Sequence, residues 1–190
     1  MRILMLGNSF TAANDLPQRL ARLTGAEVAA HTRGGARLAE QLNPRTKLGA
    51  RTKTALEGEP WDFVILQEMS HGPISSPQSF FTSVKRLCEW IHAKGATPVL
   101  FATWAYEKGG AKLAAKGWDY EDMARQLSAT YRQAAQENHA LLAEVGQRFY
   151  DLSPTRHLYA ADGVHPNEDG TQLAAEVIAE TILTHKEFTP

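Results

Sequence analysis

The sequence lacks several features that define whole classes of protein. Its 190 residues include one cysteine, Cys88, so no disulfide can form within the chain. Its longest apolar stretch, from Gly95 to Ala105, falls short of the roughly 20 residues that a membrane-spanning helix needs. No charge predominates, since 20 basic and 21 acidic side chains give a net charge of −1. These absences argue against a disulfide scaffold, a membrane protein and a nucleic-acid-binding protein.

The N-terminus does not resemble a secretion signal. It carries one basic residue, Arg2, and a short apolar run that stops at Gly7 before any cleavage site. The single cysteine is compatible with a reducing compartment. We therefore expect a cytoplasmic protein, while a leader that had been removed would leave no trace here.

The composition is that of a folded chain. Hydrophobic residues make up 43% of the sequence and charged residues 22%, which is typical of a packed globular interior. The length suits one core better than two, and no internal repeat or low-complexity tract divides it. We expect residues 1–190 to form a single domain.

Strand-like and helix-like segments alternate along the chain. Apolar runs predict strands at Ile3–Leu6, Glu27–His31, Trp61–Leu66 and Pro98–Ala102, and Ala140–Val145 fits either a short fifth strand or a helix. Helical spacing of apolar residues predicts helices around Leu16–Leu23, Ser79–Ala93, Met123–Asn138 and from Glu168 onward. Because parallel strands need helical crossovers, the predicted fold is an α/β/α sandwich with a parallel five-stranded sheet.

Ligands of such folds bind at the carboxyl ends of the strands. The segments that leave those ends are therefore the candidate site. They begin at Gly7, Gly34, Gln67 and Thr103, with a further segment after Tyr159.

The first of these segments offers a serine. In Gly7-Asn8-Ser9-Phe10, Ser9 stands where a strand turns into a helix and where unpaired backbone N–H groups point outward. A serine in this position can act as a nucleophile. Seen alone, a serine here is more often a plain helix cap behind a glycine turn.

The last segment offers an acid and a base. Asp162 precedes His165 by three residues in a Gly- and Pro-containing loop. A carboxylate at this spacing can hold one imidazole nitrogen and leave the other free as a base. The pair can also be an ordinary loop histidine beside a turn-capping aspartate. The pair matters because a nucleophilic Ser9 would need a base, and His165 oriented by Asp162 can supply one.

Taken together, these blocks resemble the SGNH hydrolases, also called GDSL-type lipases and esterases. Gly7-Asn8-Ser9 looks like the family's G-D-S turn after the first strand, and Asp162 to His165 fits its D-x-x-H block. The resemblance implies a flavodoxin-like fold, Ser9 as nucleophile, His165 as general base and acid, and Asp162 as the residue that orients it. It also implies a small ester substrate, an acyl-enzyme intermediate, and neither metal nor organic cofactor.

The family's two middle blocks supply the oxyanion hole, together with the N–H of Ser9. By this resemblance a glycine of Gly34-Gly35 donates a backbone N–H, and we favour Gly35. The third block usually reads G-x-N-D, whereas this chain has Leu66-Gln67-Glu68 at the same place. A Gln amide can donate the same bond, so Gln67 is the expected substitute for the Asn. Some carbohydrate-deacylating branches carry a similar Gln- and Glu-containing block.

Aromatic residues follow the fourth strand and suggest a substrate surface. Trp104 and Tyr106 stand just before a Gly- and Lys-rich stretch, Glu107 to Gly117, and His71 lies in the loop after the third strand. These side chains can stack on a sugar or line an acyl pocket beneath a lid. The competing interpretation is a solvated loop whose flanking aromatics pack on the domain.

Three other functions compete with a serine esterase acting on a small acyl group such as acetyl. One is a catalytically inactive module that binds a carbohydrate or another small molecule, which the atypical third block suggests. A phosphate-binding turn at Gly7 is another, but the turn lacks the further glycines of a dinucleotide fingerprint. A zinc site on His157, Asp162 and His165 is the third, and it leaves Ser9 and the glycines without a role. The oligomeric state is not predicted.

Overall fold

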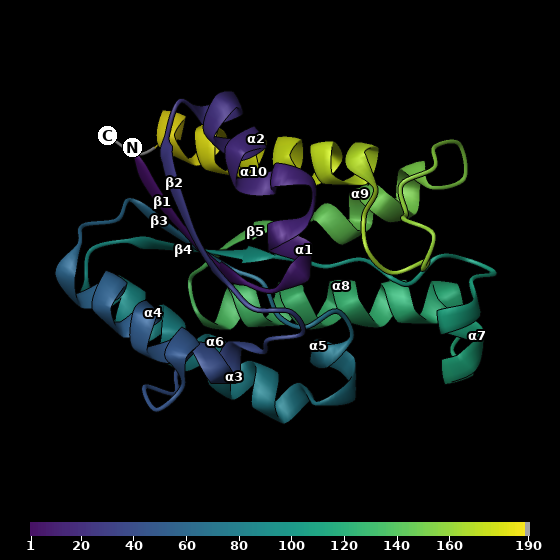
Figure 1. Ribbon diagram of the computed structural model, residues 1–190, viewed down its shortest axis with the longest axis horizontal. Helices are drawn as coiled ribbons and strands as arrows, with labels where there is room; N and C mark the ends of the chain where they lie inside the picture. The colour runs from purple at the N-terminus through teal and green to yellow at the C-terminus, as the bar shows by residue number, and fades with distance from the viewer. Residues whose placement is uncertain (189–190) are drawn as a thin grey trace.

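The computed structural model describes residues 1–188 as a parallel five-stranded sheet between two layers of helices (Figure 1). The strands are β1 (Arg2–Gly7), β2 (Glu27–Thr32), β3 (Phe63–Leu66), β4 (Thr97–Phe101) and β5 (Leu141–Ala143). Their order across the sheet is β2-β1-β3-β4-β5, and every neighbouring pair is parallel. The predicted fold class is thereby confirmed, and the ambiguous segment around Ala140–Val145 contains the fifth strand.

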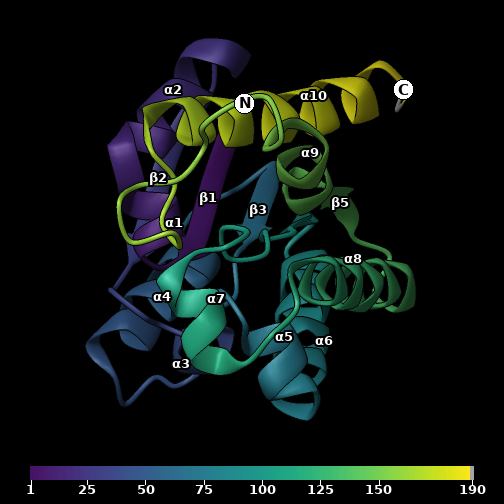
Figure 2. The same cartoon turned by 90° about the vertical axis from the view of Figure 1, so that its right-hand side faces the viewer.

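Helices of very different length connect the strands. They are α1 (Ser9–Ala12), a 3-10 turn η1 (Ala13–Asp15), α2 (Leu16–Thr24), α3 (Leu38–Gln41), α4 (Lys47–Gly58), α5 (Gly72–Ser75), α6 (Pro77–Ala93), α7 (Ala111–Lys116), α8 (Tyr120–Glu137), α9 (Val145–Leu152) and α10 (Glu168–Phe188). Figure 1 shows α2, α9 and α10 on one face of the sheet and α4, α6 and α8 on the other. Figure 2, turned by 90°, shows α2, α9 and α10 above the strands and α4, α6 and α8 below them.

Residue alternation in the strands creates two separate cores. In β1, Leu4 and Leu6 face the layer of α4, α6 and α8, whereas Ile3 and Met5 face that of α2, α9 and α10. All four are fully buried. Because successive strand side chains point to opposite faces, a strand covered on both sides must be apolar at every position. This is why Ile3–Leu6 of β1 and Phe63–Leu66 of β3 read as continuous apolar runs.

Several helices were not predicted from the sequence, and α4 shows why. Its buried face is made largely of small or polar residues, including Gly49, Thr52 and Ala55. A Cβ added at Gly49 would lie 2.1 Å from the carbonyl oxygen of Asn43, so a larger residue does not fit there. A face of this composition gives no apolar periodicity.

The stretch Glu107 to Gly117, expected as a loop or lid, also contains helix. It forms α7, which ends at Gly117 in the left-handed conformation, with φ of 63°. An ion pair from Lys108 to Glu121 ties its approach to α8. No helix among residues 1–188 is both long and apolar enough to span a membrane.

Candidate active site

The turn after β1 is packed too tightly for any residue but glycine at its start. A Cβ added at Gly7 would lie 2.2 Å from Thr11 Oγ1 and 2.7 Å from Gln67 Oε1. Asn8 then caps α1, its Oδ1 accepting a hydrogen bond from the Phe10 N–H at 3.1 Å. Ser9 is thus the first residue of α1 and is half-buried. Its hydroxyl does not cap the helix, because Asn8 does.

Ser9, His165 and Asp162 form a continuous chain of hydrogen bonds across 156 residues of sequence. Ser9 Oγ lies 2.9 Å from His165 Nε2, and His165 Nδ1 lies 2.6 Å from Asp162 Oδ2. The imidazole thus contacts the hydroxyl with one nitrogen and the carboxylate with the other. The side chains of His165 and Asp162 are 40% and 42% exposed, so the chain lies at the surface and is open to solvent.

The Asp162 carboxylate is also held by its own loop. Its Oδ1 accepts the backbone N–H groups of Val164 at 3.0 Å and His165 at 2.9 Å. Partial burial by itself raises the pKa of Asp162. Hydrogen bonds from the His165 ring and from these backbone groups outweigh burial and hold the pKa at about 2, below the ordinary 3.8. Asp162 is therefore ionised at neutral pH and turned toward the imidazole.

An aromatic stack supports the imidazole from inside. Phe10 packs edge-on against His165 with ring centroids 5.4 Å apart, and its own face stacks on Trp104 at 4.6 Å. Phe149 covers the other face of Trp104 at 4.1 Å. The indole Nε1 donates to the Val164 carbonyl oxygen at 3.0 Å, which ties the stack to the histidine loop.

The expected role of Trp104 in substrate binding is wrong. It is 1% exposed, and with both ring faces covered it has none left for a ligand. Tyr106 is likewise 6% exposed, and its hydroxyl lies 3.0 Å from Ser70 Oγ. Burial raises its pKa. Both residues follow β4 as expected, but they belong to the core beneath the site.

His71, the third expected substrate residue, is half-buried. Its Nδ1 lies 2.8 Å from Ser75 Oγ, and its ring packs edge-on against Trp118 at 5.4 Å. Partial burial and then the charges of Lys116 and Arg37 lower its pKa. Trp118 is half-buried as well and lies under the ammonium of Lys116, 5.4 Å from its ring centroid.

The loop after β2 is fastened to the serine turn. Asn8 Nδ2 donates to the Ala36 carbonyl oxygen at 3.0 Å, and an ion pair between Arg33 and Glu40 braces the loop from outside. Gly35 has a φ of 66°, a left-handed conformation that favours glycine. A Cβ at Gly34 or Gly35 would meet no atom within 4 Å, so both glycines border open space.

Gln67 does not have the surroundings expected of an oxyanion donor. It is 1% exposed, and its Oε1 accepts from the Asn8 N–H at 3.0 Å and the Thr11 hydroxyl at 2.9 Å. Its amide nitrogen donates to the Glu68 carbonyl oxygen. The side chain therefore lies beneath the serine turn and supports it, and we withdraw Gln67 as the donor.

Glu68 is a buried carboxylate that sequence reasoning did not single out. It is 3% exposed, and its two oxygens accept the backbone N–H groups of Leu38 at 3.1 Å and Met69 at 2.8 Å. Burial raises its pKa, against the lowering effect of these bonds and of Arg37. A carboxyl directly after a buried strand was the available signal, because charged groups are rarely buried without a partner. It links the loop after β2 to the end of β3.

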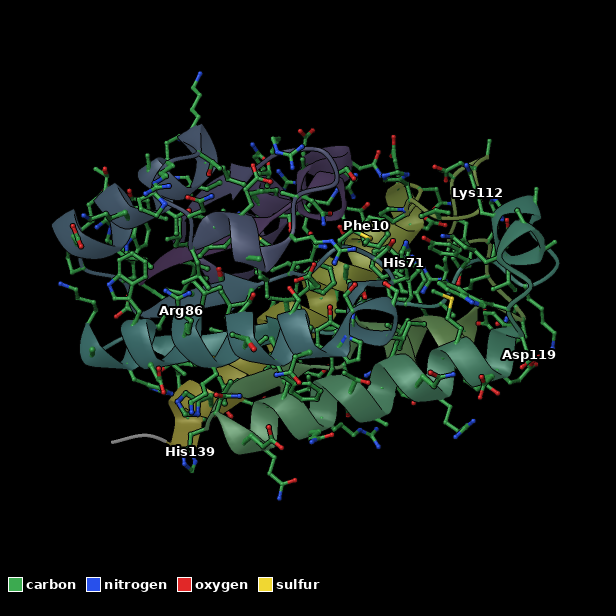
Figure 3. All side chains as sticks on the ribbon, turned by 90° about the horizontal axis from the view of Figure 1, so that it is seen from below. Phe10, His71, Arg86, Lys112, Asp119 and His139 are labelled. Carbon is green, nitrogen blue, oxygen red and sulfur yellow. The ribbon has the colours of Figure 1, made fainter. Side chains whose placement is uncertain are left out.

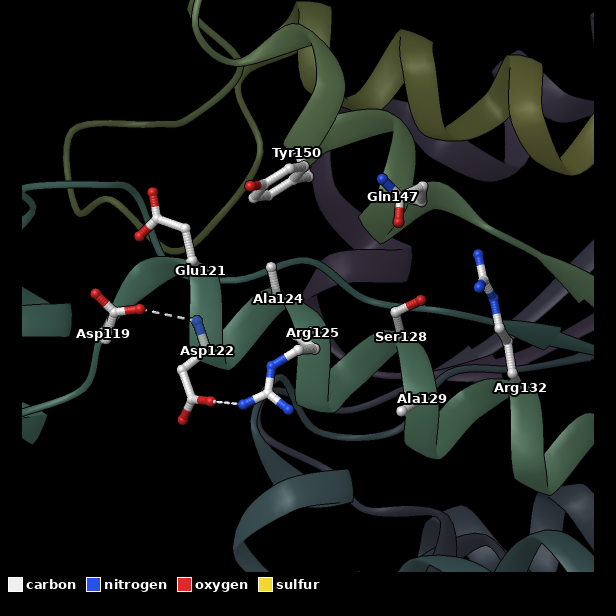
Figure 4. A pocket seen from close by; sticks show the side chains of 10 residues that line it. All are labelled: Asp119, Glu121, Asp122, Ala124, Arg125, Ser128, Ala129, Arg132, Gln147 and Tyr150. Carbon is white, nitrogen blue, oxygen red and sulfur yellow. Dashed lines mark hydrogen bonds and ion pairs between the residues drawn. The ribbon is translucent and has the colours of Figure 1, made fainter.

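Other features of the molecule lie apart from this chain of residues. A hollow of about 650 Å³ between α8 and α9 contains none of Ser9, Asp162 and His165 (Figure 4); it is lined by Asp119, Glu121, Asp122, Ala124, Arg125, Ser128, Ala129, Arg132, Gln147 and Tyr150. Within residues 1–188 no group of three or more His, Cys, Asp or Glu side chains is placed to hold a metal ion. Of the three residues considered for a zinc site, His157 has its Nδ1 3.8 Å from Glu107 Oε1. Cys88 is buried in the core, and burial raises its pKa to about 12.

Comparison with known proteins identifies the family. The profile of the GDSL-like Lipase/Acylhydrolase family matches residues 5–173. This chain belongs to that family. The resemblance to SGNH hydrolases seen in the sequence is thereby confirmed, and with it the membership of a family of hydrolases that act on small esters. No curated protein matches the chain.

Solved structures agree with this family. A protein of Slackia heliotrinireducens, described as a candidate SGNH hydrolase, is 53% identical with a TM-score of 0.93 over 96% of this chain and 98% of its own. A DUF4886 family protein of Bacteroides uniformis is 19% identical, with a TM-score of 0.75 over 97% and 83%. A catalytic mutant of an acetylxylan esterase from Geobacillus stearothermophilus is 14% identical, with a TM-score of 0.68 over 95% and 93%. These last two share the fold.

Proposed function

We propose that this protein is a serine esterase that removes a small acyl group, acetyl being the first to test, from a carbohydrate. The observation that carries the proposal is the hydrogen-bonded chain from Ser9 Oγ through His165 to Asp162. A hydroxyl, an imidazole and an ionised carboxylate in this order activate the hydroxyl oxygen for attack on a carbonyl. The acetylxylan esterase with the same fold supports the choice of acyl group and of carbohydrate.

In the first half of the proposed reaction, Ser9 Oγ attacks the ester carbonyl carbon while His165 Nε2 takes the hydroxyl proton. Asp162 holds the resulting imidazolium through Nδ1. The tetrahedral intermediate carries its negative charge on the former carbonyl oxygen. When it collapses, the bond to the alcohol breaks and His165 returns the proton to the leaving oxygen. The alcohol departs, and the acyl group stays on Ser9.

In the second half, water repeats the attack on the acyl-enzyme. His165 takes a proton from the water and then gives it to Ser9 Oγ as the acid leaves. Both halves require His165 to exchange protons with groups outside the protein. The 40% exposure of its side chain is consistent with this requirement.

The oxyanion is proposed to face the backbone N–H groups of Ser9 and Gly35. Ser9 is the first residue of α1, so its N–H has no acceptor within the helix. Gly35 borders open space, and its loop is tied to Asn8 next to Ser9. Loss of one such donor lowers turnover roughly a hundred- to a thousandfold. Gln67 enters the mechanism as a positioning residue, because it fixes the Asn8 backbone and Thr11 below the serine.

The deciding experiment is intact-mass analysis after treatment with a fluorophosphonate, which forms a stable adduct with an activated serine. We expect one adduct on the wild type and none on Ser9→Ala. Ser79→Ala is the matched control, because Ser79 is exposed at the start of α6 and should leave labelling unchanged. Hydrolysis of 4-nitrophenyl acetate should follow the same pattern. Absence of an adduct on folded wild type would favour a non-catalytic binding module on this fold.

A further inference from the structure

One arginine beside the site lacks the partner that its burial calls for. Within residues 1–188, Arg37 is the one arginine that is neither exposed nor in an ion pair; the other half-buried arginines, Arg2 and Arg19, pair with glutamates. A guanidinium withdrawn from water loses hydration that only an anion or several acceptors replace. The half-buried guanidinium of Arg37 is therefore available to bind an anion that comes from outside the chain.

The position of Arg37 is fixed relative to Ser9. The residue before it, Ala36, accepts a hydrogen bond from Asn8, which directly precedes Ser9. The residue after it, Leu38, donates its N–H to the buried carboxylate of Glu68. With both chain neighbours held, the backbone of Arg37 is anchored at the edge where the serine turn lies.

A second cation and an aromatic surface lie at the same edge of the sheet as Arg37. Leu38, next to Arg37, donates its N–H to Glu68, and a Cβ added at Gly72, next to His71, would lie 2.9 Å from the same Glu68 side chain. The His71 ring packs against Trp118 at 5.4 Å and Tyr106 at 6.3 Å, and Lys116 Nζ lies 5.4 Å from the Trp118 ring centroid. The charges of Lys116 and Arg37 both lower the pKa of His71. These residues come from the segments that follow β2, β3 and β4, whose carboxyl ends share one edge of the sheet. Glu107, next to Tyr106, donates its N–H to the Gly163 carbonyl oxygen at 2.8 Å, so this group adjoins the histidine loop.

The carboxylates nearby are engaged elsewhere. Glu68 is 3% exposed and has both oxygens bonded to backbone N–H groups, and Asp162 is bonded to His165 and its own loop. Neither forms an ion pair with Arg37 or Lys116 within the described residues. Arg37 and Lys116 therefore keep their charges without a carboxylate partner in the described residues, and Lys116 lies over the Trp118 ring, in a protein whose net charge is −1.

We propose that Arg37, supported by Lys116, binds a carboxylate carried by the alcohol part of the substrate, so that the preferred substrates are acyl esters of an acid-bearing sugar. This inference rests on the proposed esterase function. The planar guanidinium matches a carboxylate with two parallel hydrogen bonds. Trp118, half-buried beside Lys116 and His71, offers an apolar surface for a sugar ring.

The test compares two acetyl esters that differ in one charge, 4-acetoxyphenylacetate and its methyl ester. The methylene group insulates the reacting oxygen, so the two leaving groups are chemically alike. We expect wild type to favour the anionic ester in kcat/KM by about tenfold or more, as a charge-assisted hydrogen bond implies. Added salt of about 0.5 M should reduce that preference.

Substitutions of Arg37 and of a control arginine show which residue causes the preference for the anionic ester. Arg37→Gln should lower the preference toward unity, and Arg37→Lys should keep part of it, because lysine retains the charge without the planar fork. Arg86→Gln is the matched control, since Arg86 is exposed, has no ion pair within residues 1–188 and lies on α6 away from His71 (Figure 3). It should preserve the preference. Thermal unfolding of each variant verifies that the compared proteins are folded.

Specific outcomes would overturn the inference. Equal losses on both esters in Arg37→Gln would mean that Arg37 serves only to offset the charge of Glu68. Equal rates on both esters in wild type would reject the anion site and leave the esterase proposal intact. Hydrolysis of neither ester, without fluorophosphonate labelling, would reject both.

Discussion

The two sides of Ser9 are held in place by different forces. On the side of His165, a stack of Phe10, Trp104 and Phe149 supports a ring that is 40% exposed. On the side of Gln67, its buried amide oxygen accepts hydrogen bonds from the Asn8 N–H and the Thr11 hydroxyl, and these groups are shielded from water. Aromatic packing thus supports the first side from within the core, whereas buried hydrogen bonds support the second.

This difference matches what each side does in the proposed reaction. The imidazole must exchange protons with the substrate and with water, so it needs orientation together with access. The serine turn must keep one backbone shape, and buried hydrogen bonds specify shape well because leaving one unmade costs about 1–3 kcal/mol. We therefore expect substitutions of the exposed His165 and Asp162 to reduce turnover more than stability, and those on the Gln67 side to reduce both.

The largest effect is expected from Asp162→Asn. An amide cannot hold the imidazole in the required tautomer, so turnover of 4-nitrophenyl acetate should fall roughly a thousand- to ten-thousandfold. The midpoint of thermal unfolding should change little, because the side chain is 42% exposed. Asp169→Asn, at an exposed position in α10, is the control and should keep near-normal turnover. A loss of less than tenfold in Asp162→Asn would contradict the proposed role.

Gln67→Leu should give the largest combined loss of turnover and stability. It leaves the Asn8 N–H and the Thr11 hydroxyl buried without an acceptor, at about 1–3 kcal/mol each in the free energy of unfolding. Displacement of the serine turn by about 1 Å should lower turnover roughly a hundredfold. Urea unfolding and steady-state kinetics measure the two effects. The control is Gln136→Leu, at an exposed site on α8, which should lose neither turnover nor stability. If Gln67→Leu were as stable as the wild type, the proposed difference between the His165 side and the Gln67 side of Ser9 would be wrong.

Trp104→Phe separates the two contributions of Trp104 on the His165 side, the ring stack and the hydrogen bond, and its effect should be smaller. A phenyl ring keeps the stack between Phe10 and Phe149 but loses the hydrogen bond to the Val164 carbonyl. We expect about 1 kcal/mol less stability and a few-fold lower turnover. Trp104→Ala, which also removes the stack, should cost about 3–5 kcal/mol. If both variants lose turnover equally, the hydrogen bond rather than the stack positions the loop.

The smallest effect is a pH dependence of stability. The pKa of Asp162 is about 2 in the folded protein against 3.8 ordinarily, so the folded state favours the ionised form. Its contribution is present above about pH 4 and is lost as pH falls toward 2. The difference in unfolding temperature between wild type and Asp162→Asn should narrow over that interval. A difference that stays constant from pH 6 to pH 3 would exclude this linkage.

Much of the fold could be predicted from the sequence, because the buried strands are visible in it as short apolar runs. A strand buried on both faces must be apolar throughout, and Ile3–Leu6 and Trp61–Leu66 were placed within a few residues of β1 and β3. Helices with small or polar buried faces, such as α4, gave no such pattern. The positions of Ser9, Asp162 and His165 were also predictable, since short motifs at strand ends carry them.

The fold class and the candidate residues Ser9, Asp162 and His165 follow from the amino-acid sequence. Only the folded structure shows which neighbouring side chains are open to solvent beside the site and which are buried beneath it. Trp104 belongs to the core because Phe149, which is distant in sequence, covers its second face. Gln67 supports the serine turn because β1 and β3 are adjacent in the sheet. Such contacts depend on strand order and on packing between layers, and no local pattern of residues encodes them.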